Sequence, residues 1–350
     1  MRRDLKGQVV VLTGASSGIG REAAFQLARR GCRLVLAARR AEDLEDTARR
    51  CRIEGAEAGA DALAVVTDVS REEDVERLVR AAIDAFGRID VWVNNAGVTL
   101  FALLEQATFE EHRRVIETNL FGAMMAARAV IPVFRAQGAG VMVNVGSVLS
   151  QVGQPFVPSY TISKFGLRGL SEVLRVELAD EPAIQICTLL PYAVDTPHFQ
   201  SGANLRGRRA RAMPPVQSPE EVATALIALI ERPRRELHVP RVARLGLAFH
   251  ALFPQTAERL LLHALRRWHF DEVAQPRTEG NLRHPVEVGE GEVHGRRLPQ
   301  LGLGRFAAWV ALELARMQIA SLRRLVGGER RGGGRDRPPA RLPRAVAAGR

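Results

Sequence analysis

The chain has 350 residues, 46% of them hydrophobic, so it is long enough to bury a large core and to form one large domain with an appendage. The formal net charge of +11 is concentrated at the end of the chain, where residues 323–350 hold nine Arg, Glu329 and Asp336, a balance of +7. Only +4 remains for the rest, which argues against nucleic-acid binding outside the tail. No nucleic-acid partner is predicted.

The cysteines and the hydropathy pattern further limit the class of protein to which the chain can belong. Cys32, Cys51 and Cys187 are scattered at spacings that suit neither a zinc site nor a disulfide framework, so no metal site is predicted and a cytoplasmic location is expected. No apolar run of about 18 residues occurs, and the first residues lack the apolar region of a signal peptide. The sequence therefore predicts neither a membrane-spanning helix nor a signal peptide.

The first 38 residues have the pattern of a dinucleotide-binding unit. Residues 8–12 are typical of a buried strand, a glycine-rich turn follows, a helical pattern runs to Arg30, and residues 33–38 form a second predicted strand. Glycines let the backbone approach a pyrophosphate closely, and the helix N-terminus offers free N–H groups to the anion. The candidate cofactor contacts in this turn are Thr13, Gly14, Ser16, Ser17, Gly18, Ile19 and Gly20.

The end of the second predicted strand indicates which dinucleotide is bound. An acidic residue at this place binds the 2′-hydroxyl of NAD, whereas Arg accommodates the 2′-phosphate of NADP. Here the sequence is Ala37-Ala38-Arg39-Arg40, with two guanidiniums suited to phosphate oxygens and no acidic side chain. We therefore predict NADP(H), with Arg39 the first candidate for the phosphate contact and Arg40 the second. The alternative is a solvated pair of loop residues.

A third predicted strand, residues 62–67, is followed by Asp68 and Val69, two further candidate cofactor contacts. Asp68 either accepts hydrogen bonds from the adenine amine or is an ordinary residue at the end of a strand. Ser70 is predicted to cap the helix at residues 71–86, with Glu73 placed for a capping box.

A fourth predicted strand, residues 89–93, ends in small and amide residues. Such residues suit a turn that passes close to a ligand, and the carboxyl ends of strands form the ligand crevice of open α/β sheets. Asn95, Ala96 and Gly97 are therefore candidate cofactor contacts.

Two polar residues stand out farther along the chain. Asn119 lies in the middle of a predicted helix at residues 109–134, although a mid-helix Asn competes with the backbone for hydrogen bonds and is unfavourable without a reason. Ser147 follows a fifth predicted strand, residues 140–145. Both are candidates for a functional site.

Tyr160 and Lys164 lie one turn apart on a predicted helix at residues 160–179, in a chain with only two Tyr and two Lys. Residues i and i+4 share a helix face, so the ammonium lies near the phenol. A free phenol titrates near about 10, and a nearby positive charge favours the phenolate and lowers that pKa toward the working pH. The alternative is a solvated Lys beside a Tyr that starts a helix.

Taken together, these residues resemble the short-chain dehydrogenase/reductase family over residues 7 to about 240, in the order of the family. The resemblance implies an α/β fold with a doubly wound, mostly parallel, seven-stranded Rossmann-like sheet and helices on both faces. It rests on Thr13-Gly14-x-x-x-Gly18-Ile19-Gly20, Asp68, Asn94-Asn95-Ala96-Gly97, Asn119, Ser147, Tyr160-x-x-x-Lys164, Pro191 and Thr196.

The resemblance also implies a catalytic tetrad. Tyr160 would donate a proton to the carbonyl oxygen in reduction, or abstract one in alcohol oxidation, and Ser147 would hydrogen-bond that oxygen. Lys164 would hold the nicotinamide ribose and lower the pKa of Tyr160. Asn119 would hold a water that links Lys164 to solvent, and Thr196 would hydrogen-bond the carboxamide.

Two places differ from the family pattern or extend it. Tyr192 follows Pro191, a candidate cofactor contact, where the family commonly has Gly, so a bulkier side chain lies beside the nicotinamide. Residues 201–215, at the position of the substrate loop in the family, hold four Arg. This segment is either a basic lid that favours an acidic or phosphopantetheine-borne substrate, or a solvated mobile loop.

Beyond residue 240 the resemblance to the core family stops, so three parts are predicted. Residues 1–240 form the NADP-binding domain, residues 241–327 a helical extension, and residues 328–350 a disordered basic tail. The amino-acid sequence after Asp195 resembles that of a bacterial subgroup with long C-terminal extensions.

Two amphipathic helical patterns, at residues 257–268 and 303–326, are separated by a loop-like region at 271–300. Such helices cover either an exposed core or a partner subunit, which would give a homodimer or homotetramer. Their Arg, Trp and Phe content also suits peripheral binding to a membrane surface.

The sequence thus predicts an oxidoreductase that transfers a hydride between NADP(H) and a small carbonyl compound or secondary alcohol. Two alternatives remain at this point: a catalytically idle NADP(H)-binding sensor or scaffold, and a membrane-surface lipid or steroid reductase with the same chemistry.

Overall fold

A computed structural model describes residues 2–286, 292–295, 304, 308–313 and 315–316. The chain divides into two compact units, Met1–Leu303 and Gly304–Arg350. In the second unit the described residues are helical, as predicted for this part of the chain, and the predicted disordered tail lies outside the described residues. The sheet and the candidate site belong to the first unit.

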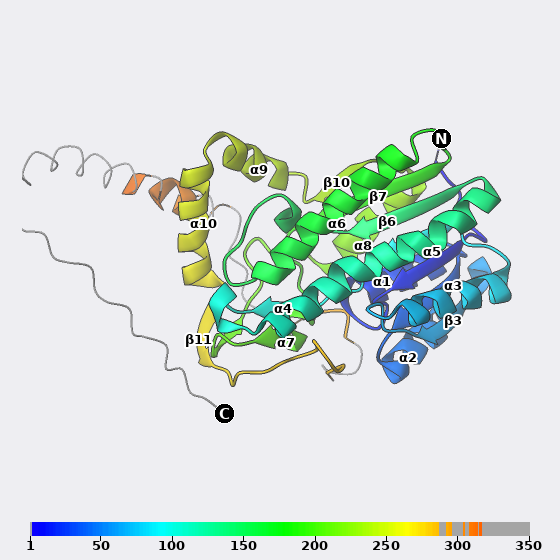
Figure 1. Cartoon of the computed structure of the whole chain (residues 1–350), viewed down its shortest axis with the longest axis horizontal. Helices are drawn as coiled ribbons and strands as arrows, with labels where there is room; N and C mark the ends of the chain where they lie inside the picture. Colours follow the sequence, from blue (N-terminus) through cyan, green and yellow to red (C-terminus); the bar gives the residue numbers. More distant parts are fainter. Residues whose placement is uncertain (1, 287–291, 296–303, 305–307, 314, 317–350) are drawn as a thin grey trace, which may run out of the picture. The chain divides into compact units, whose positions relative to one another are not determined.

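The first unit is built on a seven-stranded parallel sheet, which confirms the predicted doubly wound α/β fold (Figure 1). The strand order is β10-β7-β6-β4-β1-β2-β3, and each pairing in this sheet is parallel. The strands are β1 (Val9–Thr13), β2 (Arg33–Ala38), β3 (Asp61–Val66), β4 (Val91–Asn94), β6 (Gly140–Val145), β7 (Ile184–Pro191) and β10 (Glu236–Val239).

Helices cover both faces of this sheet (Figure 1). One layer packs on one apolar core and consists of α1 (Gly18–Ala28), α2 (Ala41–Glu54) and α8 (Pro219–Glu231). The other layer packs on a second core and consists of α3 (Glu72–Phe86), α5 (Gly122–Gln137) and α6 (Pro158–Glu177).

The alternation of side chains along the strands fills these two cores. In β1, Val10 and Leu12 belong to the core with α1 and α8, whereas Val11 belongs to the core with α3 and α5. Successive side chains of a strand point to opposite faces, so a sheet covered on both sides needs apolar residues throughout. This requirement explains why continuous apolar runs predicted the buried strands.

The predicted helix at residues 109–134 is divided at Asn119. α4 (Phe109–Ile116) is followed by a π-helical turn, η3 (Glu117–Phe121), and then by α5. The buried Asn119 side chain accepts the N–H of Val98 at 2.8 Å and donates to the Val98 carbonyl oxygen at 2.9 Å. The π-turn, a feature frequent at functional sites, thus coincides with an Asn that reaches across to the loop after β4.

The prediction that Ser70 caps the third helix is wrong. The N-cap of α3 is Arg71, which makes no side-chain cap hydrogen bond. The Ser70 hydroxyl instead donates to Asp68 Oδ1 at 2.7 Å, and the Asp68 N–H donates to Asp74 Oδ2 at 2.9 Å. The two carboxylates close this turn because they are stronger acceptors than a hydroxyl.

The predicted loop-like region at residues 271–300 contains a strand. β11 (Phe270–Ala274) pairs antiparallel with β9 (Arg208–Ala210), so the substrate-loop segment is paired with the extension rather than solvated. The remaining short elements are β5 (Leu100–Phe101), β8 (Ala203–Asn204), α7 (His198–Ser201), η1 (Ala56–Ala58), η2 (Leu104–Gln106) and η4 (Val148–Ser150).

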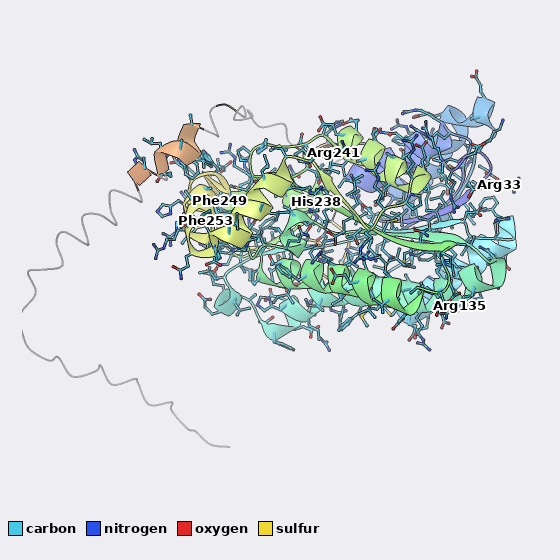
Figure 2. The ribbon with its side chains drawn as sticks, turned by 90° about the horizontal axis from the view of Figure 1, so that it is seen from above. Arg33, Arg135, His238, Arg241, Phe249 and Phe253 are labelled. Atoms are coloured by element: carbon cyan, nitrogen blue, oxygen red, sulfur yellow. The ribbon has the colours of Figure 1, made fainter. Side chains whose placement is uncertain are left out.

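The extension begins with two helices, α9 (Ala243–Leu252) and α10 (Pro254–Trp268), and α10 contains the amphipathic pattern predicted at residues 257–268. Figure 2 shows Phe249 and Phe253 together at the end of the first unit opposite Arg33 and Arg135, and their ring centroids lie 5.5 Å apart. None of the residues of α9 is buried. Within the described part of the chain, no helix has the length and apolarity required to cross a membrane.

Candidate active site

The parallel sheet brings the predicted site residues to one edge. The carboxyl ends of its strands lie at this edge, and the strand order reverses between β1 and β4, the position where open α/β sheets bind ligands. The glycine turn follows β1, Arg39 follows β2, Ser147 follows β6, and Pro191 ends β7. Residues far apart in the chain therefore share one edge of the sheet.

Thr13 and Asn95 tie the glycine turn to the end of β4. Thr13 Oγ1 accepts the N–H of Asn95 at 3.0 Å and of Ala96 at 3.1 Å, and Asn95 Nδ2 donates to the Thr13 carbonyl oxygen at 2.9 Å. Gly14 has a φ of +68°, and a Cβ there would lie 2.9 Å from Ala96 Cα. At Gly20, a Cβ would lie 2.2 Å from the Gly14 carbonyl oxygen. These residues thus shape the turn itself.

Gly14→Ala is expected to destabilise the protein more than Gly59→Ala, because the two glycines share a positive φ but differ in their surroundings. The φ of Gly59 is +79°, and a Cβ there would have no heavy atom within 4 Å. The left-handed conformation alone costs Ala about 1–2 kcal/mol. Any additional loss of unfolding free energy in Gly14→Ala, relative to Gly59→Ala, therefore measures the contact with Ala96. Urea unfolding gives both losses of free energy, and equal losses would contradict a tight turn.

The first turn of α1 offers backbone N–H groups to a ligand. α1 begins at Gly18, and its N-cap, Ser17, makes no side-chain cap hydrogen bond. The first N–H groups of a helix, here including Ile19 and Gly20, have no partner within the helix. A Cβ on Gly18 would lie 3.2 Å from Cβ of Thr196, so the predicted carboxamide contact lies beside this turn. These features fit a pyrophosphate at a helix N-terminus.

The two arginines after β2 differ in how far their charge is neutralised. Arg40 forms an ion pair with Asp43, with Nε and Oδ2 2.9 Å apart. Arg39 donates to the carbonyl oxygen of Asn281 at 2.6 Å, and it has no carboxylate within ion-pair distance among the described residues. Arg39 is therefore the guanidinium with more charge left for a phosphate.

Asp68 and Ser16 lie beside these two guanidiniums, and Val69 follows Asp68 in the chain. Burial lowers the pKa of Arg39, and the charge of Asp68 acts in the opposite direction. Ser16 Oγ accepts a hydrogen bond from Arg40 at 3.3 Å, and Val69 packs against the start of α5. The predicted contacts of the adenosine half thus gather at the ends of β2 and β3.

The extension contacts three of the predicted cofactor residues through backbone carbonyl oxygens. The pairs are Arg39 with Asn281 (2.6 Å), Arg40 with Val286 (3.2 Å) and the Gly18 N–H with Glu292 (3.1 Å). Gly295 lies against the same edge, where a Cβ would be 2.7 Å from both Asp195 Oδ1 and the Thr196 carbonyl oxygen. The sequence did not predict this contact, because residues 271–300 have only a loop-like pattern.

Tyr160 and Lys164 share one face of α6, as predicted. Lys164 Nζ lies 5.4 Å from the centroid of the Tyr160 ring and donates to the Val145 carbonyl oxygen at 2.7 Å. Ser147, directly after β6, shares a hydrogen bond with the Tyr160 side chain. The phenol, the ammonium and the hydroxyl therefore meet at the edge of the sheet.

Asn119 and Gly97 lie against the same group. Asn119 Nδ2 donates to Ser163 Oγ at 3.0 Å, and the Ser163 hydroxyl donates to the Tyr160 carbonyl oxygen at 2.7 Å. A Cβ on Gly97 would lie 3.3 Å from Asn119 Oδ1 and 3.9 Å from Lys164 Nζ. The structure thus brings the four predicted tetrad residues together beside the loop after β4.

The pKa of Tyr160 lies above its ordinary value of 10, whereas the resemblance implied that Lys164 would lower it. Burial raises the pKa of Tyr160 to about 12, and the hydrogen bond with Ser147 offsets only part of this rise. Burial also lowers the pKa of Lys164 to about 8. Desolvation disfavours the charged form of each group, and it dominates here. Tyr160 is therefore protonated at neutral pH.

Two arginines of the substrate-loop segment are engaged with the protein. Arg206 donates to Gln106 Oε1 at 2.7 Å, and its guanidinium lies 4.8 Å from the centroid of the Phe156 ring. Arg209 forms an ion pair with Asp271 of β11 at 2.6 Å. These contacts hold two of the four arginines of the segment against the protein.

Comparisons with known proteins agree with this geometry. The family model described as short chain dehydrogenase matches residues 8–204. The uncharacterized oxidoreductase YxnA of Bacillus subtilis is 36% identical over 286 residues, which cover 80% of this chain and 79% of that protein. Such coverage amounts to about 280 residues, so the likeness to this relative extends past residue 240 into the extension. Human dehydrogenase/reductase SDR family member 7 is 37% identical over 193 residues, 55% of this chain and 57% of that protein.

The chain is also similar to solved structures that hold a nicotinamide cofactor. The alcohol dehydrogenase of Thermococcus sibiricus, complexed with 5-hydroxy-NADP, is 31% identical with a TM-score of 0.58, over 67% of this chain and 96% of that chain. L-Sorbose reductase of Gluconobacter frateurii, complexed with NADPH and L-sorbose, is 26% identical with a TM-score of 0.60, over 68% and 97%. A Burkholderia phymatum member, in complex with NAD, is 25% identical with a TM-score of 0.64, over 78% and 100%. The chain belongs to the short-chain dehydrogenase/reductase family, whose members are oxidoreductases that use a nicotinamide cofactor.

Proposed function

We propose that the protein reduces a carbonyl compound with NADPH, with Tyr160 as the proton donor. The observation that carries the proposal is the half-buried phenol of Tyr160, hydrogen-bonded to Ser147 and close to the Lys164 ammonium, at the edge of the sheet that holds the glycine turn. The alcohol dehydrogenase and the L-sorbose reductase named above, whose structures hold NADP-type cofactors, support this class of reaction.

Each residue of the tetrad has a part in this proposal. A bound nicotinamide cofactor supplies the hydride to the carbonyl carbon. The oxygen becomes an alkoxide more basic than a phenolate, so Tyr160 gives it a proton. Ser147 hydrogen-bonds the same oxygen as charge develops. The Lys164 ammonium stabilises the phenolate that remains, and Asn119 holds the loop after β4 in place through Val98.

Consumption of NADPH in the presence of a panel of ketones and aldehydes tests the activity directly. The proposal predicts turnover with at least one of them and much weaker turnover with NADH. Tight binding of NADPH without turnover of any carbonyl compound would instead support an idle sensor or scaffold.

Arg39→Ala is expected to lower kcat/KM for NADPH about 10- to 100-fold and to leave that for NADH nearly unchanged. A hydrogen bond to a charged group contributes about 1.5–3 kcal/mol, and only NADPH has the 2′-phosphate. Arg40→Ala is the matched control, with a smaller expected loss because Arg40 is already paired with Asp43. Steady-state kinetics with each cofactor measures these ratios. A larger loss for Arg40→Ala would reverse the assignment.

A further inference from the structure

His198 lies directly beside the proposed proton donor. It is the first residue of α7, in the segment after β7. The centroid of its ring lies 5.7 Å from that of Tyr160, with the two planes inclined at 58°. The charge of Lys164 also acts on it. The imidazole therefore borders the position at which a substrate oxygen would meet the Tyr160 hydroxyl.

The imidazole of His198 has hydrogen-bonding capacity that the described protein leaves unused. Burial and the Lys164 charge lower its pKa to about 4, so it is neutral at pH 7, with one N–H donor and one acceptor nitrogen. Among the residues that the structure describes, neither ring nitrogen has a hydrogen-bond partner. By contrast, His112 bonds Ser159 Oγ at 2.7 Å and the Leu104 carbonyl oxygen at 2.9 Å.

The neighbours of His198 are aromatic. The ring of Phe199 lies edge-on to it at 6.0 Å, and Phe101 stacks on Phe199 at 6.1 Å. Phe270, from β11 of the extension, lies edge-on to Phe101 at 6.5 Å. An apolar wall of this kind cannot satisfy an imidazole. The His198 side chain is half-buried, so its nitrogens can bond a ligand or water that enters beside Tyr160.

We propose that His198 binds a second oxygen atom of the substrate, in addition to the carbonyl oxygen that meets Tyr160 and Ser147. The inference rests on the proposed function. The substrate class is a ketone or aldehyde with an apolar body that packs on Phe199 and with a further hydroxyl or carbonyl oxygen about one ring away from the reacting carbon. A neutral imidazole can donate to or accept from such a group, so both kinds of oxygen fit.

Pairs of cyclohexanones with equal shape test this assignment. Each pair consists of a hydroxycyclohexanone and a methylcyclohexanone substituted at the same position, either 3 or 4, and NADPH consumption gives kcat/KM for both members. The intact protein is expected to favour the hydroxyl member of at least one pair by about tenfold or more, the effect of one hydrogen bond in an enclosed site. The variant His198→Phe is expected to lose this preference, because kcat/KM for the hydroxyl member falls much more than that for the methyl member.

Two further variants test whether the preference depends on the hydrogen-bonding groups of His198. His198→Gln keeps a donor and an acceptor and is expected to restore part of the preference. His112→Phe removes a histidine whose nitrogens are already satisfied by Ser159 and Leu104 and is expected to keep the preference. Circular dichroism confirms that each variant is folded.

The proposal is overturned if the intact protein reduces both members of every pair equally well, or if His198→Phe keeps the preference. The first of these results needs no variant, so a misfolded His198→Phe cannot hide the answer. Absence of NADPH consumption with every carbonyl compound, in these pairs and in the wider panel, would refute the proposed function itself and is thus a distinct result.

Discussion

Tyr160→Phe is expected to lower kcat/KM for carbonyl reduction by about 10²- to 10⁴-fold, the range for loss of a general acid. The substitution removes one hydroxyl and keeps the ring that packs beside His198 and Lys164. Affinity for NADPH is expected to change little, because the glycine turn and Arg39 are untouched. Steady-state kinetics and equilibrium titration with NADPH measure the two effects separately.

Tyr192→Phe is the matched control, since Tyr192 is the other tyrosine of the chain. Burial raises its pKa to about 12 as well, and its hydroxyl donates to the Pro214 carbonyl oxygen at 3.3 Å. Its removal is expected to cost about 1 kcal/mol of stability and to leave most of the activity. A small effect for Tyr160→Phe, or equal losses for both variants, would refute Tyr160 as the proton donor.

Lys164→Met is expected to abolish most of the activity and to change how stability depends on pH. The buried ammonium of Lys164 titrates at about 8 in the folded protein, against an ordinary value of 10.5. Below pH 8 the folded and unfolded chains both carry this proton, so the full cost of burying the charge is present. Between pH 8 and 10.5 the unfolded chain binds more protons at this site, so the free energy of unfolding rises with pH.

The expected size of this rise is about 3 kcal/mol, which corresponds to the displacement of the pKa from 10.5 to about 8. The Lys164→Met variant is expected to lack this rise in the free energy of unfolding. The difference in unfolding free energy between the intact protein and the variant should therefore shift by this amount in favour of the intact protein as the pH rises from 8 to 10.5. Urea unfolding at several pH values gives the curve, and comparison with the variant cancels most other groups that titrate in this range.

Lys6→Met is the control for any Lys-to-Met exchange, because Lys6 is the other lysine of the chain and is exposed. A pH-independent difference between the intact protein and Lys164→Met would mean that the Lys164 ammonium is not desolvated. Activity offers a second readout. If the ammonium assists Tyr160, kcat/KM should fall as the pH rises through about 8.

Local pattern was enough to predict the sheet, because its central strands are covered on both faces and are therefore largely apolar. It failed where one polar group competes with another. Ser70 has the spacing of a helix cap, yet its hydroxyl bonds Asp68, whose N–H is in turn held by Asp74. Neither the π-turn at Asn119 nor the strand β11 had a periodic signal, since both depend on partners distant in the chain.

The sequence by itself determined the class of fold and the predicted tetrad. Its motifs are local: Tyr160 and Lys164 lie four residues apart, and the glycine turn directly follows β1. The tertiary structure alone decided the pKa of Tyr160, since desolvation depends on everything packed around the phenol. It also decided that carbonyl oxygens of the extension bond Gly18 and Arg39, and that His198 lies against Tyr160. Contacts between residues so far apart follow from how the elements pack, which no local spacing specifies.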